Sequence, residues 1–149
     1  MTIKTAIIGL GIMGRRMAEH MALHPDFSVV AMWDPDPASC ALAQAVIPAT
    51  AISADAQEAI AQADLVYLAC PPMPRKTYAE MAAAAGKALF LEKPLGTDVA
   101  QSRDLVRKIG ACNVPAAVNF TQAAGDALAE VTAAAQSGTL GALRARILL

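Results

Sequence analysis

The stretch Thr2-Ile-Lys-Thr-Ala-Ile-Ile-Gly-Leu-Gly-Ile-Met-Gly14 decides the fold of this chain. An apolar run that leads into closely spaced glycines and then into a helical pattern predicts a buried strand, a tight turn and a helix. Gly9, Gly11 and Gly14 match G-x-G-x-x-G, in which the first glycine permits the turn, the second lets the backbone approach a pyrophosphate, and the third lets helix and strand pack closely. The helix N-terminus, with its unpaired N–H groups and positive dipole end, would bind that pyrophosphate.

A second strand with an acid at its end follows the glycine stretch in the register of a dinucleotide-binding fold. Residues 27–33 form an apolar run, and Asp34 comes about 20 residues after the last glycine, where such folds carry an acid for the ribose hydroxyls. Asp34 would repel the 2′-phosphate of NADP, and Pro35-Asp36-Pro37 offers no arginine to bind it. The sequence therefore favours NAD over NADP. A purely structural strand–helix turn would explain the glycines but not the acid in register.

Length and composition fit a globular protein. A chain of 149 residues makes one ordinary domain, or one domain plus a piece of another. Its hydrophobic content of 56% can bury a core, and strands covered on both faces need such apolar runs. A net charge of −1 without a basic cluster argues against nucleic acid as a partner.

The cysteines and the apolar runs indicate the cellular compartment of the protein. Cys40, Cys70 and Cys112 are odd in number and widely spaced, which is typical of thiols in a reducing compartment. No apolar run approaches the roughly 18 residues of a membrane span. We therefore expect a cytoplasmic protein without membrane contact, and we expect no metal site.

Trp33 is expected to pack outside its strand, with stacking on adenine as the weaker alternative.

The rest of the chain alternates strand and helix patterns. This alternation predicts an α/β fold with a Rossmann-type doubly wound parallel sheet. The expected strands are residues 3–8, 27–33, 50–52, 64–70, 87–92 and 114–120. The expected helices are residues 12–24, 37–46 and 75–85, with further helices that begin after the caps Ser53 and Asp98, the last closed by Gly110.

Residues beyond about 121 do not fit this sheet. Residues 126–137 are expected to form an alanine-rich helix, and Leu143–Leu149 a strand. A hydrophobic strand at the end of a chain is an exposed edge that pairs with other strands. We therefore expect residues 1–121 to form the dinucleotide-binding domain, and residues 122–149 to begin a second, incomplete α+β domain.

A second motif, Glu92-Lys93-Pro94, ends the predicted strand 87–92. The carboxyl edge of an open α/β sheet is where ligands bind. Because Pro94 stops the strand and disfavours helical geometry at Lys93, the lysine ammonium can project over the crevice. There it could hold a hydroxyl or carbonyl oxygen or pass a proton, and its position alone is equally compatible with an ordinary solvated lysine.

Together with Gly9–Gly14, Asp34-Pro-Asp-Pro37, Cys70-Pro-Pro72 and Ala85–Leu95, this motif resembles the Gfo/Idh/MocA oxidoreductases. The resemblance implies an N-terminal Rossmann domain that binds NAD or NADP, and a C-terminal sheet that binds sugar and mediates homo-oligomerisation. It also implies an enzyme that oxidises a hydroxyl of a sugar or polyol to a ketone, with hydride transfer to the nicotinamide.

By this resemblance, Lys93 would be the catalytic residue that orients the substrate oxygen and joins its proton relay. The residues expected to bind the cofactor are Gly9, Gly11, Ile12, Met13, Gly14, Asp34, Cys70, Pro71, Glu92, Lys93 and Asn119. Arg75 departs from the family, which commonly has a histidine there, and Gln122 and Ala123 stand where it commonly has an arginine. Because the chain ends before the usual acid/base residue of the second domain, we expect it to bind NAD but to be inactive alone.

Two other functions stay open. The 3-hydroxyacid dehydrogenases share Gly-Leu-Gly-Ile-Met-Gly, although Asp34-Pro-Asp-Pro37 and Glu92-Lys93-Pro94 fit the first family better. A non-catalytic dinucleotide sensor, which could form an oligomer through Leu143–Leu149, belongs to another functional class. Cys70 adds a smaller alternative, a reactive thiol near the crevice, but a packing thiol is favoured.

Overall fold

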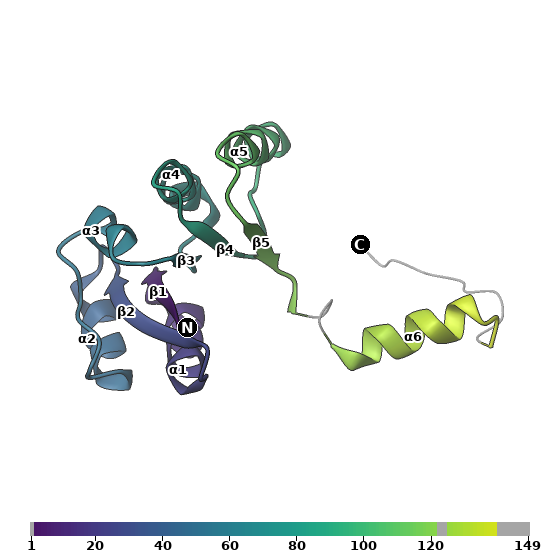
Figure 1. The fold of residues 1–149 in the computed structure, drawn as a ribbon, viewed down its shortest axis with the longest axis horizontal. Coiled ribbons are helices and arrows are strands. Elements are labelled where there is room, and N and C mark those ends of the chain that lie inside the picture. The colour runs from purple at the N-terminus through teal and green to yellow at the C-terminus, as the bar shows by residue number, and fades with distance from the viewer. Residues whose placement is uncertain (1, 122–124, 140–149) are drawn as a thin grey trace. The chain divides into compact units, whose positions relative to one another are not determined.

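The structure is a computed structural model that describes residues 2–121 and 125–139. The chain divides into two compact units, Met1–Asn119 and Phe120–Leu149. Within its described part, the first unit is a parallel sheet of five strands in the order β2-β1-β3-β4-β5 (Figure 1). The strands are β1 Ile3–Ile8, β2 Phe27–Trp33, β3 Leu65–Leu68, β4 Ala88–Glu92 and β5 Ala116–Asn119.

The strand order reverses beside β1. The chain continues from β1 to β2 on one side and then returns to β3 on the other side. Ile8, at the end of β1, pairs with both Trp33 and Leu68, so the carboxyl ends of three strands meet. In open parallel sheets, such a reversal creates the crevice in which ligands bind.

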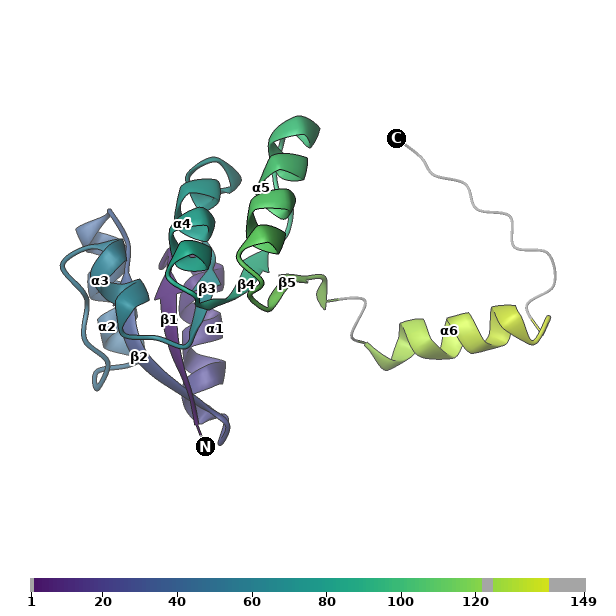
Figure 2. The same cartoon turned by 45° about the horizontal axis from the view of Figure 1, so that its top comes forward.

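Helices cover both faces of the sheet, as Figures 1 and 2 show. They are α1 Ile12–Leu23, α2 Pro37–Val46, α3 Ala56–Ala61, α4 Pro72–Ala84 and α5 Val99–Ala111. α1 and α2 share one core cluster with Ile7 and Met32, whereas α3, α4 and α5 share another with Ile8 and Leu89. The predicted Rossmann-type doubly wound sheet is therefore confirmed.

α1 packs on the sheet through small residues. Gly14, Ala18 and Met21, spaced four and three residues apart, form its buried face. The larger side chains of Ile12 and Leu23 lie outside this face, and they are 77% and 80% exposed. The close approach of the helix at Gly14 selects the face that carries the small residues.

Several element boundaries differ from the predictions. Residues 50–52 form no strand but a single bridge, between Met32 and Ile52. Asp55, not Ser53, caps α3, because its carboxylate accepts the Glu58 N–H at 2.7 Å while the Glu58 side chain accepts the Ala54 N–H.

The start of α4 and the end of α5 also differ from the predicted boundaries. α4 begins at Pro72 rather than at Arg75, since a proline is tolerated in the first turn, where its missing N–H would have no partner. α5 continues through Gly110 to Ala111, and Asn113 adopts the left-handed conformation after it, with φ of 55°. The strands predicted at 64–70, 87–92 and 114–120 are shorter in the structure, at Leu65–Leu68, Ala88–Glu92 and Ala116–Asn119.

The second unit contains α6, Asp126–Gln136, which matches the predicted helix. The predicted strand Leu143–Leu149 lies outside the described residues, and the start of a second domain at residue 122 stays a prediction. Within residues 2–121 and 125–139, no helix combines the length and apolar character that a membrane crossing needs.

Candidate functional site

A cleft of about 520 Å³ lies where β1, β2, β3 and β4 end. Its lining residues come from the four segments that follow these strands. They are Gly9, Gly11 and Met13; Trp33, Asp34, Pro35 and Ser39; Ala69, Cys70, Pro71, Pro74, Arg75 and Tyr78; and Glu92 and Lys93. The cleft therefore occupies the position at which open α/β sheets bind ligands.

The three glycines have three different environments. Gly9 has φ of 92°, and a Cβ there would lie 2.4 Å from the Cys70 nitrogen, so only glycine fits this turn. A Cβ at Gly14 would lie 1.8 Å from the Gly9 carbonyl oxygen, which explains the close packing of α1 on the loop. A Cβ at Gly11 would meet nothing within 4 Å, so this backbone is open to a ligand.

The N-terminus of α1 is available to an anion. Gly11 is the N-cap, no side chain caps the helix, and no acidic residue lies in its first turn. The first N–H groups of a helix have no partner inside it, and together with the helix dipole they attract phosphate. Met13 lines the cleft beside this turn.

Asp34 is fixed against the glycine loop. Its Oδ2 accepts the Leu10 N–H at 2.7 Å, and its Oδ1 accepts the Asp36 N–H at 2.9 Å. Because each carboxylate oxygen can accept more than one hydrogen bond, both oxygens keep capacity for the hydroxyls of a ligand. Arg15 supports the loop from the other side by donating to the Leu10 carbonyl at 2.7 Å.

Glu92 is a buried carboxylate with three donors. It is 4% exposed, and its Oε1 accepts from the Tyr67 hydroxyl and, at 2.6 Å, from the Asn119 amide. Its Oε2 accepts the Lys93 N–H at 3.2 Å. These bonds compensate the burial of the carboxylate. Burial and the neighbouring Glu92 raise the pKa of Tyr67 far above its ordinary value, so Tyr67 stays a donor.

Arg75 joins two of the loops that line the cleft. Its guanidinium donates twice to the Cys70 carbonyl, at 3.1 and 2.6 Å, and also to the carbonyls of Glu92 and Pro94. The side chain is 3% exposed and forms no ion pair among the described residues. Arg75 therefore fixes the Glu92–Pro94 segment to the start of α4.

Lys93 and Cys70 contribute differently to the cleft. Lys93 is exposed, and its ammonium makes no hydrogen bond or ion pair with any described residue. Burial raises the pKa of the Cys70 thiol to about 11. The thiol is therefore protonated at neutral pH, which supports the packing interpretation over a reactive one.

The structure brings most of the predicted site residues together. Gly9, Gly11, Met13, Asp34, Cys70, Pro71, Glu92 and Lys93 line the cleft. Three do not line it: Ile12 is exposed on α1, Gly14 is buried under the loop, and Asn119 lies behind Glu92.

The prediction missed Arg75, Tyr67 and Tyr78 as parts of the site. In the sequence, Tyr67 lies within an apolar strand and cannot be distinguished from an ordinary core aromatic residue. Arg75 was identified only as a departure from the family pattern. Trp33, expected to pack outside its strand, is half-buried in the cleft wall beside Tyr78.

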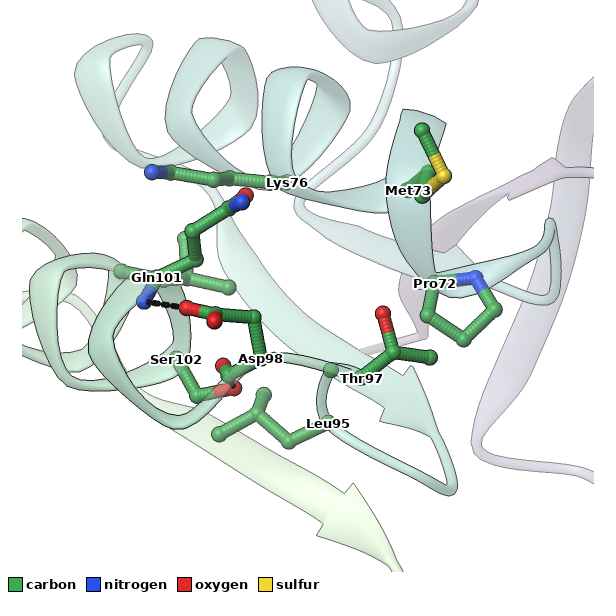
Figure 3. Close-up of a pocket in the computed structure, with 10 residues that line it drawn as sticks. Pro72, Met73, Lys76, Leu95, Thr97, Asp98, Gln101 and Ser102 are labelled. Carbon is green, nitrogen blue, oxygen red and sulfur yellow. Dashed lines mark hydrogen bonds between the residues drawn. The ribbon is translucent and has the colours of Figure 1, made fainter.

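A smaller cavity of about 170 Å³ lies between α4 and the segment before α5 (Figure 3). Its charged side chains, Lys76 and Asp98, already have partners. Asp98 caps α5 by accepting the Gln101 N–H at 2.7 Å, and Lys76 pairs with Asp104 at 3.1 Å. We assign no ligand to it. Over the part of the chain that the structure describes, no three His, Cys, Asp or Glu side chains are placed to hold a metal ion.

The glycine turn, the uncapped helix and the carboxylate after β2 define a dinucleotide-binding Rossmann domain. A family model described as "Oxidoreductase family, NAD-binding Rossmann fold" matches residues 3–120. The chain therefore belongs to the Gfo/Idh/MocA oxidoreductase family, as the sequence motifs predicted.

Known relatives point to the same domain. Inositol 2-dehydrogenase of Rhizobium meliloti (strain 1021) is 27% identical over 141 residues, which are 95% of this chain and 43% of that protein. The scyllo-inositol dehydrogenase of Lactobacillus casei, solved with NAD(H) and scyllo-inositol, matches with a TM-score of 0.85 at 25% identity, over 95% of this chain and 43% of that one. The myo-inositol 2-dehydrogenase of Lactobacillus plantarum shares the fold, with a TM-score of 0.85 at 23% identity, over the same shares of the two chains. This chain thus spans less than half the length of these relatives and corresponds to the NAD-binding Rossmann domain of the family.

Proposed function

We propose that this chain binds NAD in the cleft, as the nucleotide-binding part of a dehydrogenase that oxidises a hydroxyl of a sugar, polyol or related small molecule. The observation that carries the proposal is the 2.7 Å hydrogen bond from the Leu10 N–H to Asp34. It holds the carboxylate beside the open backbone of Gly11, as a pyrophosphate and its adjoining ribose require.

The choice of NAD over NADP follows from the charges after β2. Asp34 would lie at the ribose hydroxyls and would repel a 2′-phosphate there. Asp36 adds a second carboxylate nearby, and hydrogen bonds from Ser39 and Ala38 hold its pKa below the ordinary value. Both aspartates disfavour NADP, and none of the described cleft residues contributed by the end of β2 and the segment after it is an arginine.

Lys93 is the proposed catalytic residue. Bound nicotinamide would accept the hydride, and Lys93 would hold the substrate oxygen and take part in moving its proton. Glu92 fixes the Lys93 backbone, and Arg75 fixes the carbonyls on both sides of it. The Lys93 ammonium can therefore adjust to a substrate while its backbone is held in place.

The remaining parts of this proposal concern a longer protein of which, judged by the length of its relatives, this chain would be a part. We infer that residues 1–121 are the dinucleotide-binding domain and that residues 122–149 begin a substrate domain, which would supply the acid/base residue and a homo-oligomeric contact. The family match favours this enzyme over a 3-hydroxyacid dehydrogenase. A non-catalytic sensor would bind NAD equally well, and turnover of polyols by the longer protein would exclude it.

Isothermal titration calorimetry of the chain with NAD and NADP tests the proposal. NAD should bind more tightly than NADP by about tenfold or more, because the like charges oppose each other. Asp34→Asn keeps the shape of the side chain but removes its negative charge, so the difference in affinity between NAD and NADP should become smaller. Absence of NAD binding, or tighter binding of NADP, would contradict the proposal.

A further inference from the structure

One wall of the cleft is aromatic. Trp33 at the end of β2 and Tyr78 on α4 both line the cleft, and both are half-buried, so each ring keeps part of its surface accessible. Their ring centroids are 5.6 Å apart, and their planes meet at 70°. Two rings in this edge-to-face arrangement form a corner, in which a flat ligand ring can stack on one ring and contact the edge of the other.

This corner adjoins the proposed ribose position. Trp33 directly precedes Asp34 in the chain. Burial raises the pKa of Tyr78, and Cys70 and Asp34 raise it further, so the phenol lies within electrostatic range of the same carboxylate. The aromatic surface of the cleft is therefore next to the group that would bind the ribose.

We propose that Trp33 and Tyr78 form the wall that binds the purine base of the dinucleotide, and that they hold the base by its faces. The inference rests on the proposed function, because a base is attached directly to the ribose that Asp34 would bind. It must then lie against the groups beside Asp34.

The same side of the cleft offers few free groups for the edge of a base. Its other lining side chains there are Pro35, which has no polar side-chain atom, and Ser39, whose hydroxyl already donates to Asp36 at 2.8 Å. Stacking on aromatic rings tolerates different bases, because every base has a π face. The wall should therefore discriminate weakly between adenine and other purines.

Trp33 is the only tryptophan of the chain, so its fluorescence reports on the wall directly. The chain would be titrated with NAD, ADP-ribose and nicotinamide mononucleotide while its emission is recorded, with calorimetry as an independent measure of binding. NAD and ADP-ribose should change the emission to the same extent, and nicotinamide mononucleotide should leave it unchanged.

Substitutions test the contribution of each ring. Trp33→Leu and Tyr78→Leu should each weaken ADP-ribose binding about five- to hundredfold by calorimetry, the range expected for loss of one stacking contact. Trp33→Phe and Tyr78→Phe keep a ring and should lose much less. Circular dichroism checks folding, and the emission titration of the unsubstituted chain tests the proposal even where a variant fails to fold.

The nicotinamide–hypoxanthine dinucleotide tests recognition by faces, since it changes the edge of the base and keeps the ring. It should bind within about threefold of NAD, and a loss beyond about tenfold would overturn this part of the inference. NAD binding in calorimetry without any change in Trp33 emission would overturn the aromatic wall alone. Failure of NAD to bind at all would instead contradict the proposed function.

Discussion

Two regions of the cleft are built in opposite ways. The glycine loop and Asp34 leave space, N–H groups and carboxylate capacity unused, as the open backbone at Gly11 shows. Around Glu92, by contrast, buried polar groups bond to one another, and no buried side-chain nitrogen or oxygen of the described residues lacks a partner. The first region is shaped to be completed by a ligand, whereas the second is organised in advance and presents Lys93.

Gly14→Ala should have the largest effect and would show how tightly the first region is packed. Its Cβ would lie 1.8 Å from the Gly9 carbonyl oxygen, so helix and loop must separate. We expect a loss of about 3 kcal/mol or more in the free energy of unfolding, measured with urea.

Two other glycines provide the controls for Gly14→Ala. Gly110→Ala, in α5 with nothing within 4 Å of the new Cβ, should stabilise by up to about 1 kcal/mol. Gly11→Ala should fold normally but weaken NAD binding, because the methyl group occupies the proposed path of the pyrophosphate. Equal stability of Gly14→Ala and the unsubstituted chain would refute the packing argument.

Arg75→Met tests the organisation of the second region. It removes the donors to the carbonyls of Cys70, Glu92 and Pro94 and keeps much of the side-chain volume. We expect a loss of about 2–3 kcal/mol in urea unfolding, since hydrogen bonds to charged groups are the stronger ones. Arg103→Met, at an exposed position on α5, is the matched control and should stay within about 0.5 kcal/mol. Similar values for the two variants would show that Arg75 does not hold the loops.

Tyr67→Phe should have a smaller effect that depends on pH. Removal of the hydroxyl leaves Glu92 with one donor fewer and should cost about 1–2 kcal/mol at pH 7. The pKa of Tyr67 is raised in the folded state, so its neutral form is favoured there and stability is lost as pH rises above the unfolded value of about 10. The unsubstituted chain should therefore lose more stability than Tyr67→Phe between pH 9 and 11. A parallel pH dependence of the two proteins would contradict the buried network.

The same contrast explains what the sequence could predict. The first region depends on glycines and an acid at fixed spacing, so Gly9, Gly11 and Asp34 were identifiable from residue type alone. In the second region, the Glu92-Lys93-Pro94 motif identified Glu92 and Lys93 as site residues. Arg75 and Tyr67 bind partners that the spacing of residues in the sequence does not reveal. The strand predicted at residues 50–52 was wrong for a related reason. A β-rich pattern does not show how many pairing partners a neighbouring strand offers, and here only Met32 pairs, with Ile52.

The most direct measurement is a crystal structure of the chain with NAD bound. We predict the pyrophosphate at Gly11 and the N-terminus of α1, with an Asp34 oxygen about 2.6–3.2 Å from a hydroxyl of the adenosine ribose. NAD bound outside this cleft, or a ribose beyond hydrogen-bonding distance of Asp34, would contradict the account.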